Sequence, residues 1–282
     1  MIFTMLFRSY LAPMNPNKDC FLGSSCPNPK ISTEKWQSTT FFSGSREQVI
    51  SCLANFMGKF LPPCSVGIKI NLSSPPSAVA PKTDPVFLSD ILACLIRMGY
   101  SVTLVEGANG HLRENLTAIG LERFLCEPTV GLLDTDLEED VLWKELHGRR
   151  YPIPKCLQCL DVRLAVPCAT KCHGFVFSCN VKTFVGLLPR SKCVNGTDST
   201  FSRPIIHEDL TETISDLYRI VCETIPFHYY LNGGNTFSEA SILRELPEYY
   251  CSADPIELDA YIASILHTEL PEYLTRLNKI NA

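Results

Sequence analysis

The chain has 282 residues, of which 45% are hydrophobic and 20% are charged, and its formal net charge at pH 7 is -5. A chain of this length and composition can bury a sizeable core, so we expect a soluble, globular, cytoplasmic protein. The negative charge argues against the broad basic surface that nucleic-acid binding requires. No apolar run approaches the roughly 20 residues that span a bilayer, so we expect no membrane partner either.

The N-terminal segment MIFTMLFRSYLAPMNP is apolar but contains Arg8 and has no basic stretch before its apolar part. This pattern predicts a first β-strand over Ile2–Leu11, with a secretory signal peptide as the alternative. Residues 12–45 are rich in Pro, Ser, Asn and Gly, which indicates a loop with a short strand near residues 39–42.

Residues 46–105 alternate between helical and strand patterns. The spacing predicts a helix over 46–60, a strand over 65–72, a helix after Thr83 as its N-cap, and a strand over 101–105. A strand–helix–strand order is typical of a parallel sheet, and we therefore predict an α/β fold. We assign residues 64–282 to this domain, and the N-terminal strand, loop and helix of residues 1–63 to the same domain.

Polar residues occur where these strands end. Lys69 and Asn71 share one side of their strand, because strand side chains alternate. A lysine in a buried parallel strand is costly unless it is paired, so we expect Lys69 near the carboxyl end, facing the crevice. Glu106 follows the next strand and is a candidate general base or a partner for Lys69; the alternative is an exposed acid at a helix start.

Residues 134–146 contain a charge run and the start of an insertion. The acidic run DTDLEED, residues 134–140, is most simply a solvated turn, since no glycine-bearing calcium loop follows it. Residues 141–146 and 149–157 resemble a hairpin inserted before the central part of the chain.

The stretch 161–189, DVRLAVPCATKCHGFVFSCNVKTFVGLLP, carries the strongest chemical signal. It begins with a strand-length apolar run, continues into a turn with Lys171 and His173, and ends in a segment, 177–188, that can be helical. Ligands of open α/β sheets bind at the carboxyl ends of the strands, so these side chains are placed for chemistry. Lys182 either joins them in an anion site or extends its ammonium to water from an apolar stretch.

The C-terminal third adds further candidates. His207 opens a predicted helix, where a neutral imidazole is favoured and can act as a base, with a surface cap as the alternative. A strand over 225–231 ends in a glycine turn whose backbone amides can hold an oxyanion; it comprises Asn232, Gly233, Gly234 and Asn235. A strand over 246–252 precedes a helix that starts at Asp254 and Pro255, and Asp259 does not fit the apolar stripe of that helix.

The chain contains 14 cysteines. A chain of this size needs no disulfide scaffold, and buried free thiols are expected at apolar-face positions such as Cys52, Cys94, Cys222 and Cys251. Four further cysteines are candidate metal ligands, although one CxxC pair is a weak signal for zinc and the ferredoxin-type run is absent: Cys156, Cys159, Cys168 and Cys172.

Seven segments in order resemble the bacterial and archaeal family called domain of unknown function 362, over about residues 64–267. They are GIKINL, TDPVFLSDIL, VTLVEG, PCATKCHG…NVKTFVGLLP, IIHEDLTETISDL, LNGGN and CSADPIELDAY. The resemblance implies a Rossmann-like, mostly parallel sheet with helices on both faces, similar to the amino-terminal part of lactate racemases. Many members carry a ferredoxin-type cysteine cluster, which this chain lacks, so the resemblance does not imply electron transfer here.

The resemblance also implies site residues. The Lys-x-His core of the family falls on Lys171 and His173, and its following lysine on Lys182. The remaining matched positions are Lys69, Asn71, His207, the glycine turn Asn232–Asn235, Asp254, Pro255 and Asp259.

Two functions are compatible with these residues. The first is a lyase or isomerase without an organic cofactor that acts on a small anionic molecule; crowded lysines lower one another's pKa, so one can serve as a base. His173 or Lys171 would be the base and Lys182 the clamp on a leaving group such as sulfate or phosphate. The second is a redox-associated protein that holds an iron–sulfur cluster or zinc through the four cysteines and His173. In either case the protein can be a homo-oligomer, or a subunit whose site a partner protein completes.

Overall fold

The computed structural model describes residues 41–75, 78, 80–172, 175–193, 209–237 and 243–281. The predicted strand over Ile2–Leu11 lies outside these residues. The helices are α1 (Arg46–Met57), α2 (Pro85–Arg97), α3 (Leu112–Ala118), α5 (Leu210–Thr224), α6 (Pro255–Ile265) and α7 (Glu272–Asn281). Short 3-10 helices are η1 (Glu122–Cys126), η2 (Thr135–Leu137), η3 (Lys155–Cys159), η4 (Lys182–Leu187) and η5 (Arg190–Lys192).

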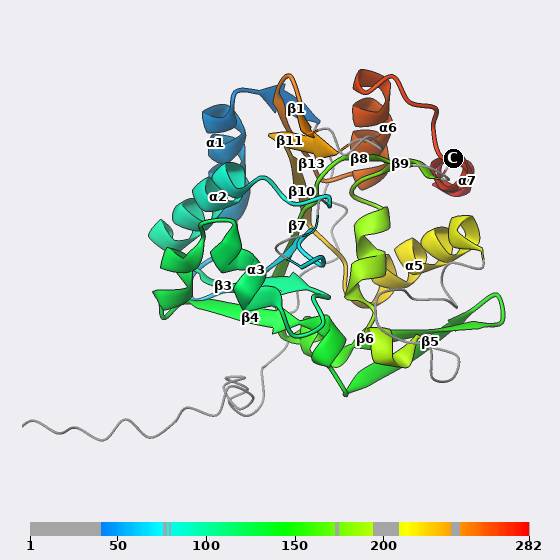
Figure 1. Cartoon of the computed structure of the whole chain (residues 1–282), viewed down its shortest axis with the longest axis horizontal. Helices are drawn as coiled ribbons and strands as arrows, with labels where there is room; N and C mark the ends of the chain where they lie inside the picture. The colour runs from blue at the N-terminus through cyan, green and yellow to red at the C-terminus, as the bar shows by residue number, and fades with distance from the viewer. Residues whose placement is uncertain are drawn as a thin grey trace, which may run out of the picture. The chain divides into compact units, whose positions relative to one another are not determined.

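A seven-stranded sheet forms the centre of the fold, in the order β1-β13-β10-β7-β2-β3-β4 (Figure 1). Its strands are β1 (Phe42–Gly44), β2 (Ser65–Ile70), β3 (Ser101–Glu106), β4 (Val130–Asp134), β7 (Val162–Val166), β10 (Tyr229–Asn232) and β13 (Tyr249–Ser252). Neighbours from β10 through β4 are parallel, whereas β13 is antiparallel to both β10 and β1.

The strand order defines the topology. Numbered by their order in the chain, the five parallel strands lie in the order 3-2-1-4-5 from β4 to β10. This is the Rossmann arrangement, in which the strand order reverses between the first and fourth strands. Here that reversal lies between β2 and β7, which are hydrogen-bonded from Val66↔Val162 to Ile70↔Val166. The α/β prediction is confirmed, and the switch point is located.

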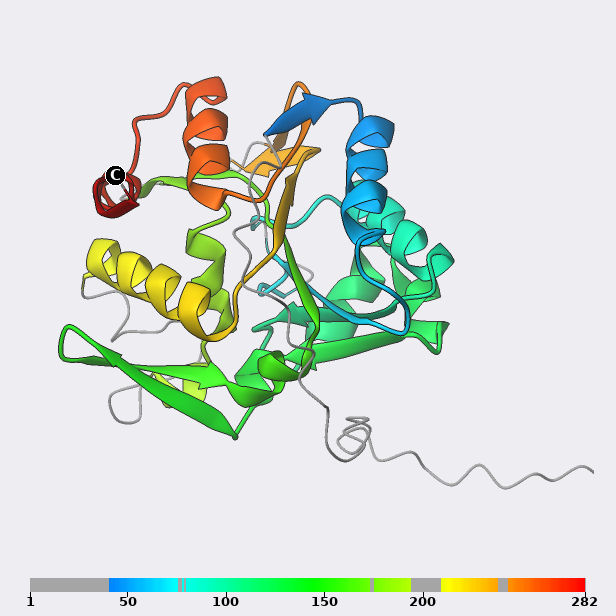
Figure 2. The ribbon, with the colours of Figure 1, turned by 180° about the vertical axis from the view of Figure 1, so that it is seen from behind.

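Helices cover both faces of the sheet (Figures 1 and 2). Adjacent strand residues point to opposite faces: Leu164 belongs to the buried cluster that contains α1, α2 and α3 residues, and Ala165 to the cluster that contains α5, α6 and α7 residues. Val105 and Tyr230 join Ala165 on the second face, and there they meet η4. Both faces of the sheet are therefore buried beneath helices, which explains the near-continuous apolar character of the parallel strands.

Local capping explains where several helices begin. Ser45 and Gln48 form a capping box at α1. Asp84 caps α2, with Pro85 in the first turn, so the predicted cap at Thr83 is wrong by one residue. Asp209 caps α5, which begins at Leu210; the helix start predicted at His207 lies outside the described residues. Asp254 caps α6 before Pro255, as expected for a start at these two residues.

Two smaller sheets complete the described structure. Strands β5 (Val141–Leu146) and β6 (Arg149–Pro154) form the predicted hairpin. A four-stranded sheet in the order β12-β11-β8-β9 consists of β8 (Thr170–Cys172), β9 (Phe175–Ser178), β11 (Asn235–Phe237) and β12 (Leu243–Glu245).

This second sheet corrects the description of the central stretch. Lys171 lies in strand β8 rather than in a turn, because β8 pairs with β9 and, in parallel, with β11. The segment 177–188 is not one helix: β9 ends at Ser178 and η4 begins at Lys182. Within the described ranges, no helix is long and apolar enough to cross a membrane.

Candidate functional site

Lys69 and Glu106 form a buried ion pair at the carboxyl ends of β2 and β3. The Lys69 Nζ lies 3.0 Å from the Glu106 Oε1, and the two residues are 0% and 1% exposed. Glu106 also accepts hydrogen bonds from the backbone N–H groups of Leu72 (2.8 Å) and Gly107 (2.8 Å), while Lys69 donates to the Ile70 carbonyl at 2.7 Å. The predicted pairing is present, and Glu106 is not an exposed acid at a helix start.

Gly186 of η4 closes this pair from the side. A Cβ atom at Gly186 would lie 2.9 Å from both the Lys69 Nζ and the Glu106 Oε1. The Gly186 carbonyl accepts a hydrogen bond from the Thr135 hydroxyl at 3.1 Å, which fixes η4 against the end of β4. Because Lys69 is fully buried beneath this glycine, its ammonium does not face solvent, although the sequence predicted a substrate contact there.

Asn71 and Thr83 bridge the switch point between β2 and β7. The Asn71 Oδ1 accepts the backbone N–H of Cys168 at 2.8 Å. The Thr83 hydroxyl donates to the Val166 carbonyl at 2.6 Å and accepts the Asn71 N–H at 2.8 Å. These bonds hold the chain that leaves β7 beside the end of β2. Asn71, predicted to bind substrate, therefore fixes the backbone that leads to Lys171.

A buried polar cluster lies where η4 begins. Asp259 of α6 accepts the N–H groups of Asn180 (2.8 Å) and Val181 (3.0 Å), as well as the Asn180 side-chain amide at 2.8 Å. The same amide donates to the Asn232 Oδ1 at 2.7 Å. Burial raises the pKa of Asp259 to about 6, against the opposing effect of these hydrogen bonds. Asp259 therefore interrupts the apolar stripe of α6 because it is a buried hydrogen-bond acceptor for Asn180 and Val181.

The glycine turn after β10 is packed against protein atoms. A Cβ at Gly233 would collide with the Tyr249 ring, and one at Gly234, whose φ is +69°, would collide with the Asp84 side chain. The Asn235 N–H donates to the Asp84 Oδ2 at 3.4 Å. The turn therefore joins the start of α2 in this structure. Asp254 likewise serves as the α6 cap, accepting the N–H groups of Ile256 and Glu257.

Asp134 and Asp136 are not part of a solvated turn, which corrects the prediction for the acidic run. Asp134 accepts the backbone N–H groups of Ala108 (2.9 Å) and Gly110 (2.6 Å). Asp136 lies 3.1 Å from the Arg190 Nε, and Arg190 donates to the Gly107 carbonyl at 3.0 Å. Burial raises the pKa of Asp134. No local pattern pointed to Arg190, because its partners are more than fifty residues away.

The predicted cations have different surroundings. Lys171 is exposed on β8, and Lys182 is half-buried at the first position of η4. His173 and His207 lie outside the described residues, so the structure does not relate them to the lysines. Both lysines follow residues that are bonded to Asn232 in the buried polar cluster. Before Lys171, the Pro167 carbonyl accepts a hydrogen bond from Asn232 at 3.1 Å. Before Lys182, Asn180 donates to Asn232.

Three of the candidate metal cysteines lie at opposite ends of strand β7. Cys156 and Cys159 belong to η3, which precedes β7, whereas Cys168 follows β7. Five strand residues at about 3.3 Å each separate the two groups by roughly 16 Å. Zinc–sulfur bonds are about 2.3 Å long, so Cys156 and Cys159 cannot share one zinc ion with Cys168. In the described part of the chain, no group of three or more His, Cys, Asp and Glu side chains is placed to hold a metal ion.

Other cysteines follow the expected pattern with one exception. Cys94 and Cys251 are buried and Cys52 is half-buried, but Cys222 is exposed, contrary to the prediction from its helical position. Cys168 and Cys179 are buried next to the polar cluster, and the Cys179 sulfur accepts the Asn232 amide at 3.1 Å. Burial raises the pKa of Cys179 well above its usual range, which makes it a packing residue rather than a nucleophile.

The strand order, the helices on both faces and the polar residues at the carboxyl edge define a Rossmann-like α/β protein. The chain belongs to the family described as Domain of unknown function (DUF362), which it matches over residues 66–264. No curated protein matches the chain.

Among solved structures, the chain is similar to the lactate racemase apoprotein from Thermoanaerobacterium thermosaccharolyticum. The identity is 14% and the TM-score is 0.45, and the match covers 79% of this chain and 55% of the racemase chain. The chain thus corresponds to about half the length of that protein.

Proposed function

We propose that this chain is a cytoplasmic enzyme that binds a small anionic substrate at the carboxyl edge of β2 and β7 and transforms it by acid–base chemistry. The observation that supports this proposal is the bonding at the switch point, where Asn71 and Asn232 tie the chain leaving β7 to β2 and β10. That is the position at which open α/β sheets bind ligands, and Lys171 follows directly.

The proposed roles follow from exposure and chemistry. Lys171 is exposed and can reach a solute, and either it or His173 is the proposed base. Lys182 is the proposed clamp on the charge that develops on the substrate or leaving group. His207 is a proposed second acid or base. The Lys69–Glu106 pair lies beneath η4 and supports the segment that carries Lys182. The reaction class is proton abstraction next to a carboxylate, or elimination or displacement of an anionic leaving group, without an organic cofactor.

Exchange of carbon-bound protons and release of sulfate together test this proposal, because the first reports proton abstraction and the second reports loss of the leaving group. The protein is incubated in D₂O with a panel of short 2-hydroxy and 2-sulfooxy carboxylates, and the α-proton signal is followed by ¹H NMR. We expect enzyme-dependent loss of the signal, or release of sulfate, for at least one member of the panel. Lys171→Ala and His173→Ala should each reduce the rate by a factor of about 10² or more.

Lys279→Ala is the matched control, because Lys279 is an exposed lysine of α7. It should react at the wild-type rate. Equal rates in the Lys171, His173 and Lys279 variants would contradict the assignment of the base.

A further inference from the structure

Asp259 accepts hydrogen bonds from the segment that leads into η4, although it belongs to α6. Its carboxylate is 0% exposed and receives two backbone N–H groups and one side-chain amide, from Asn180 and Val181. The charge is thus compensated by dipoles of a single segment. A buried carboxylate held in this way fixes the position of the backbone that supplies the donors.

The bonding continues from η4 to β7. Asn180 donates to Asn232, and Asn232 donates to the carbonyl of Pro167, the residue after β7. Asn180 and Asn232 are 0% and 1% exposed. One chain of hydrogen bonds therefore links Asp259 to both segments that carry the exposed and half-buried lysines, Lys171 and Lys182.

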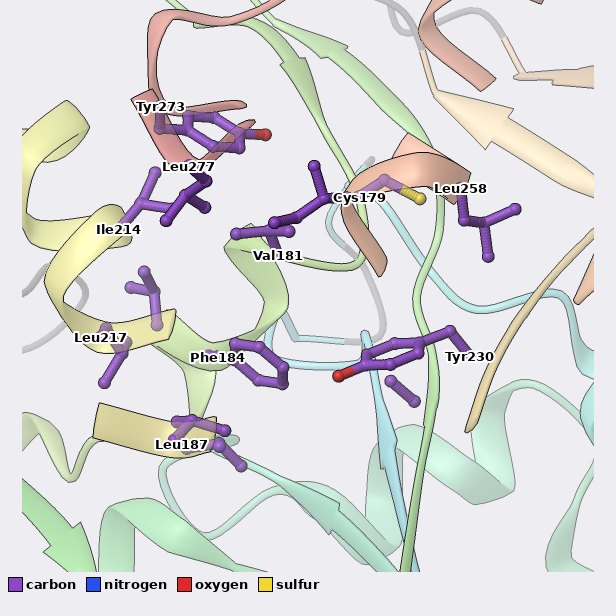
Figure 3. Packing of buried hydrophobic residues seen from close by; sticks show 14 of the residues in the cluster. Cys179, Val181, Phe184, Leu187, Ile214, Leu217, Tyr230, Leu258, Tyr273 and Leu277 are labelled. Atoms are coloured by element: carbon purple, nitrogen blue, oxygen red, sulfur yellow. The ribbon is translucent and has the colours of Figure 1, made fainter. Parts of the chain in front are cut away.

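Apolar packing and hydrogen bonds both hold the start of η4. Val181, Phe184 and Leu187 pack among residues of α5 and α7 (Figure 3). Figure 3 shows Phe184 between Leu217 and Tyr230, and the Phe184 and Tyr230 ring centroids are 6.4 Å apart. The hydrogen bonds to two successive N–H groups add a directional constraint to this packing, because they require defined distances and angles.

We propose that Asp259 is a positioning residue that holds η4 and the chain leaving β7 in register, so that Lys171 and Lys182 meet one anion only while its carboxylate is ionised. This inference rests on the proposed anion site and adds a regulation to it. Protonation removes the negative charge and places a hydrogen on one oxygen, which weakens the hydrogen bonds from Asn180 and Val181 and so releases the start of η4.

Among the described residues that face Asp259, three other side chains can ionise, and the pKa of each is raised. Cys179 precedes η4, Tyr230 lies on β10 and Tyr273 on α7, and burial raises the pKa of each well above its usual range. Asp259 itself has a pKa of about 6. Protonation of an imidazole at His173 or His207 would strengthen anion binding, which is the opposite sign from the effect proposed for Asp259.

Sulfate titrations by isothermal calorimetry between pH 5 and 8 test the inference. For the wild type we expect the dissociation constant to rise about tenfold from pH 7 to pH 5, the factor for a required carboxylate that titrates near pH 6. Asp259→Asn should bind weakly throughout and show no such rise. Glu257→Gln, a change of an exposed acid on the same helix, should retain the wild-type profile.

Hydrogen exchange measured by mass spectrometry supplies a readout that does not depend on the anion. In the wild type at pH 5, and in Asp259→Asn at pH 7, peptides covering 179–188 and 167–171 should show lower protection factors than in the wild type at pH 7, while α2 remains protected. Unchanged protection of both segments in the wild type at pH 5 would overturn the inference, and this result does not require the variant to be purified.

The outcomes separate the two proposals. Loss of sulfate binding in Lys182→Ala but not in Asp259→Asn at pH 7 would overturn the positioning role and leave the anion site intact. Failure of the wild type to bind sulfate, phosphate or a 2-hydroxy carboxylate at any pH would overturn both.

Discussion

Lys69 and Glu106 are 37 residues apart in sequence, yet their charged atoms lie 3.0 Å apart inside the protein. Parallel pairing of β2 and β3 sets Lys69 opposite Val105, the residue before Glu106, and so delivers both side chains to the same edge. Gly186 packs against the pair, and Glu106 accepts the N–H groups of Leu72 and Gly107 while Lys69 donates to the Ile70 carbonyl.

Removing one member of this pair should destabilise the protein strongly. Lys69→Met leaves a buried carboxylate without its cation, which costs about 3–5 kcal/mol in the free energy of unfolding. The double variant Lys69→Met, Glu106→Gln should cost less than the sum of the two single changes, because it no longer buries an unpaired charge. Urea unfolding of the four proteins measures this coupling, and strictly additive losses would show that the two side chains do not interact.

Gly186 should not accept a methyl group. Gly186→Ala places a Cβ 2.9 Å from both charged atoms, and the required shift should cost about 1–3 kcal/mol. Gly131→Ala is the matched control, since its Cβ would meet its nearest atom, the Thr103 Oγ1, at 3.5 Å. Comparable melting temperatures for the two variants would argue against close packing of η4 on the ion pair.

His228 should make stability depend on pH. Burial, aided by the nearby Arg163 charge, lowers the pKa of His228 to about 4, while its Nδ1 accepts the Arg163 N–H at 3.0 Å. The folded-state pKa lies below the unfolded value of about 6.5, so this contribution is present above pH 6.5 and is lost as the pH falls toward 4.

His228→Asn retains an acceptor but does not titrate. The stability advantage of the wild type over this variant should therefore shrink by up to about 3 kcal/mol between pH 7 and pH 4. Urea midpoints at several pH values measure it, and a constant difference would contradict the buried, neutral imidazole.

Cysteine reactivity should follow burial rather than sequence proximity. Cys126 and Cys159 are exposed, whereas Cys168 and Cys179 are buried and the pKa of Cys179 is raised by that burial. Iodoacetamide at pH 8 should modify the first two within minutes and the last two only after denaturation. Peptide mass spectrometry gives the order, and early labelling of Cys179 would mean that the polar cluster is open.

The sequence allowed prediction of those elements that depend on local periodicity. The helices and strands over 46–105 lie close to their predicted bounds. The Lys69–Glu106 contact could also be predicted, because strand alternation and parallel pairing together place both residues at one edge. The hairpin of β5 and β6 could also be predicted from the sequence, since its two strands are adjacent in the chain.

Features held by distant partners were not predictable in this way. Strand β8 has three residues and is stabilised by pairing with β11 at Phe237↔Thr170, so no local pattern distinguishes it from a turn. Asp134 and Asp136 resemble a solvated charge run until the N–H groups of residues 108–110 and Arg190 are brought to them. The donors of Asp259 lie 78 and 79 residues away in the chain.

The proposed anion site can be tested most directly by crystallising the protein with selenate and recording anomalous diffraction at the selenium edge. We expect an anomalous peak within hydrogen-bonding distance of the ammonium groups of both Lys171 and Lys182, beside the carboxyl ends of β2 and β7. Selenate bound only at other surfaces, with these two ammonium groups far apart, would contradict it.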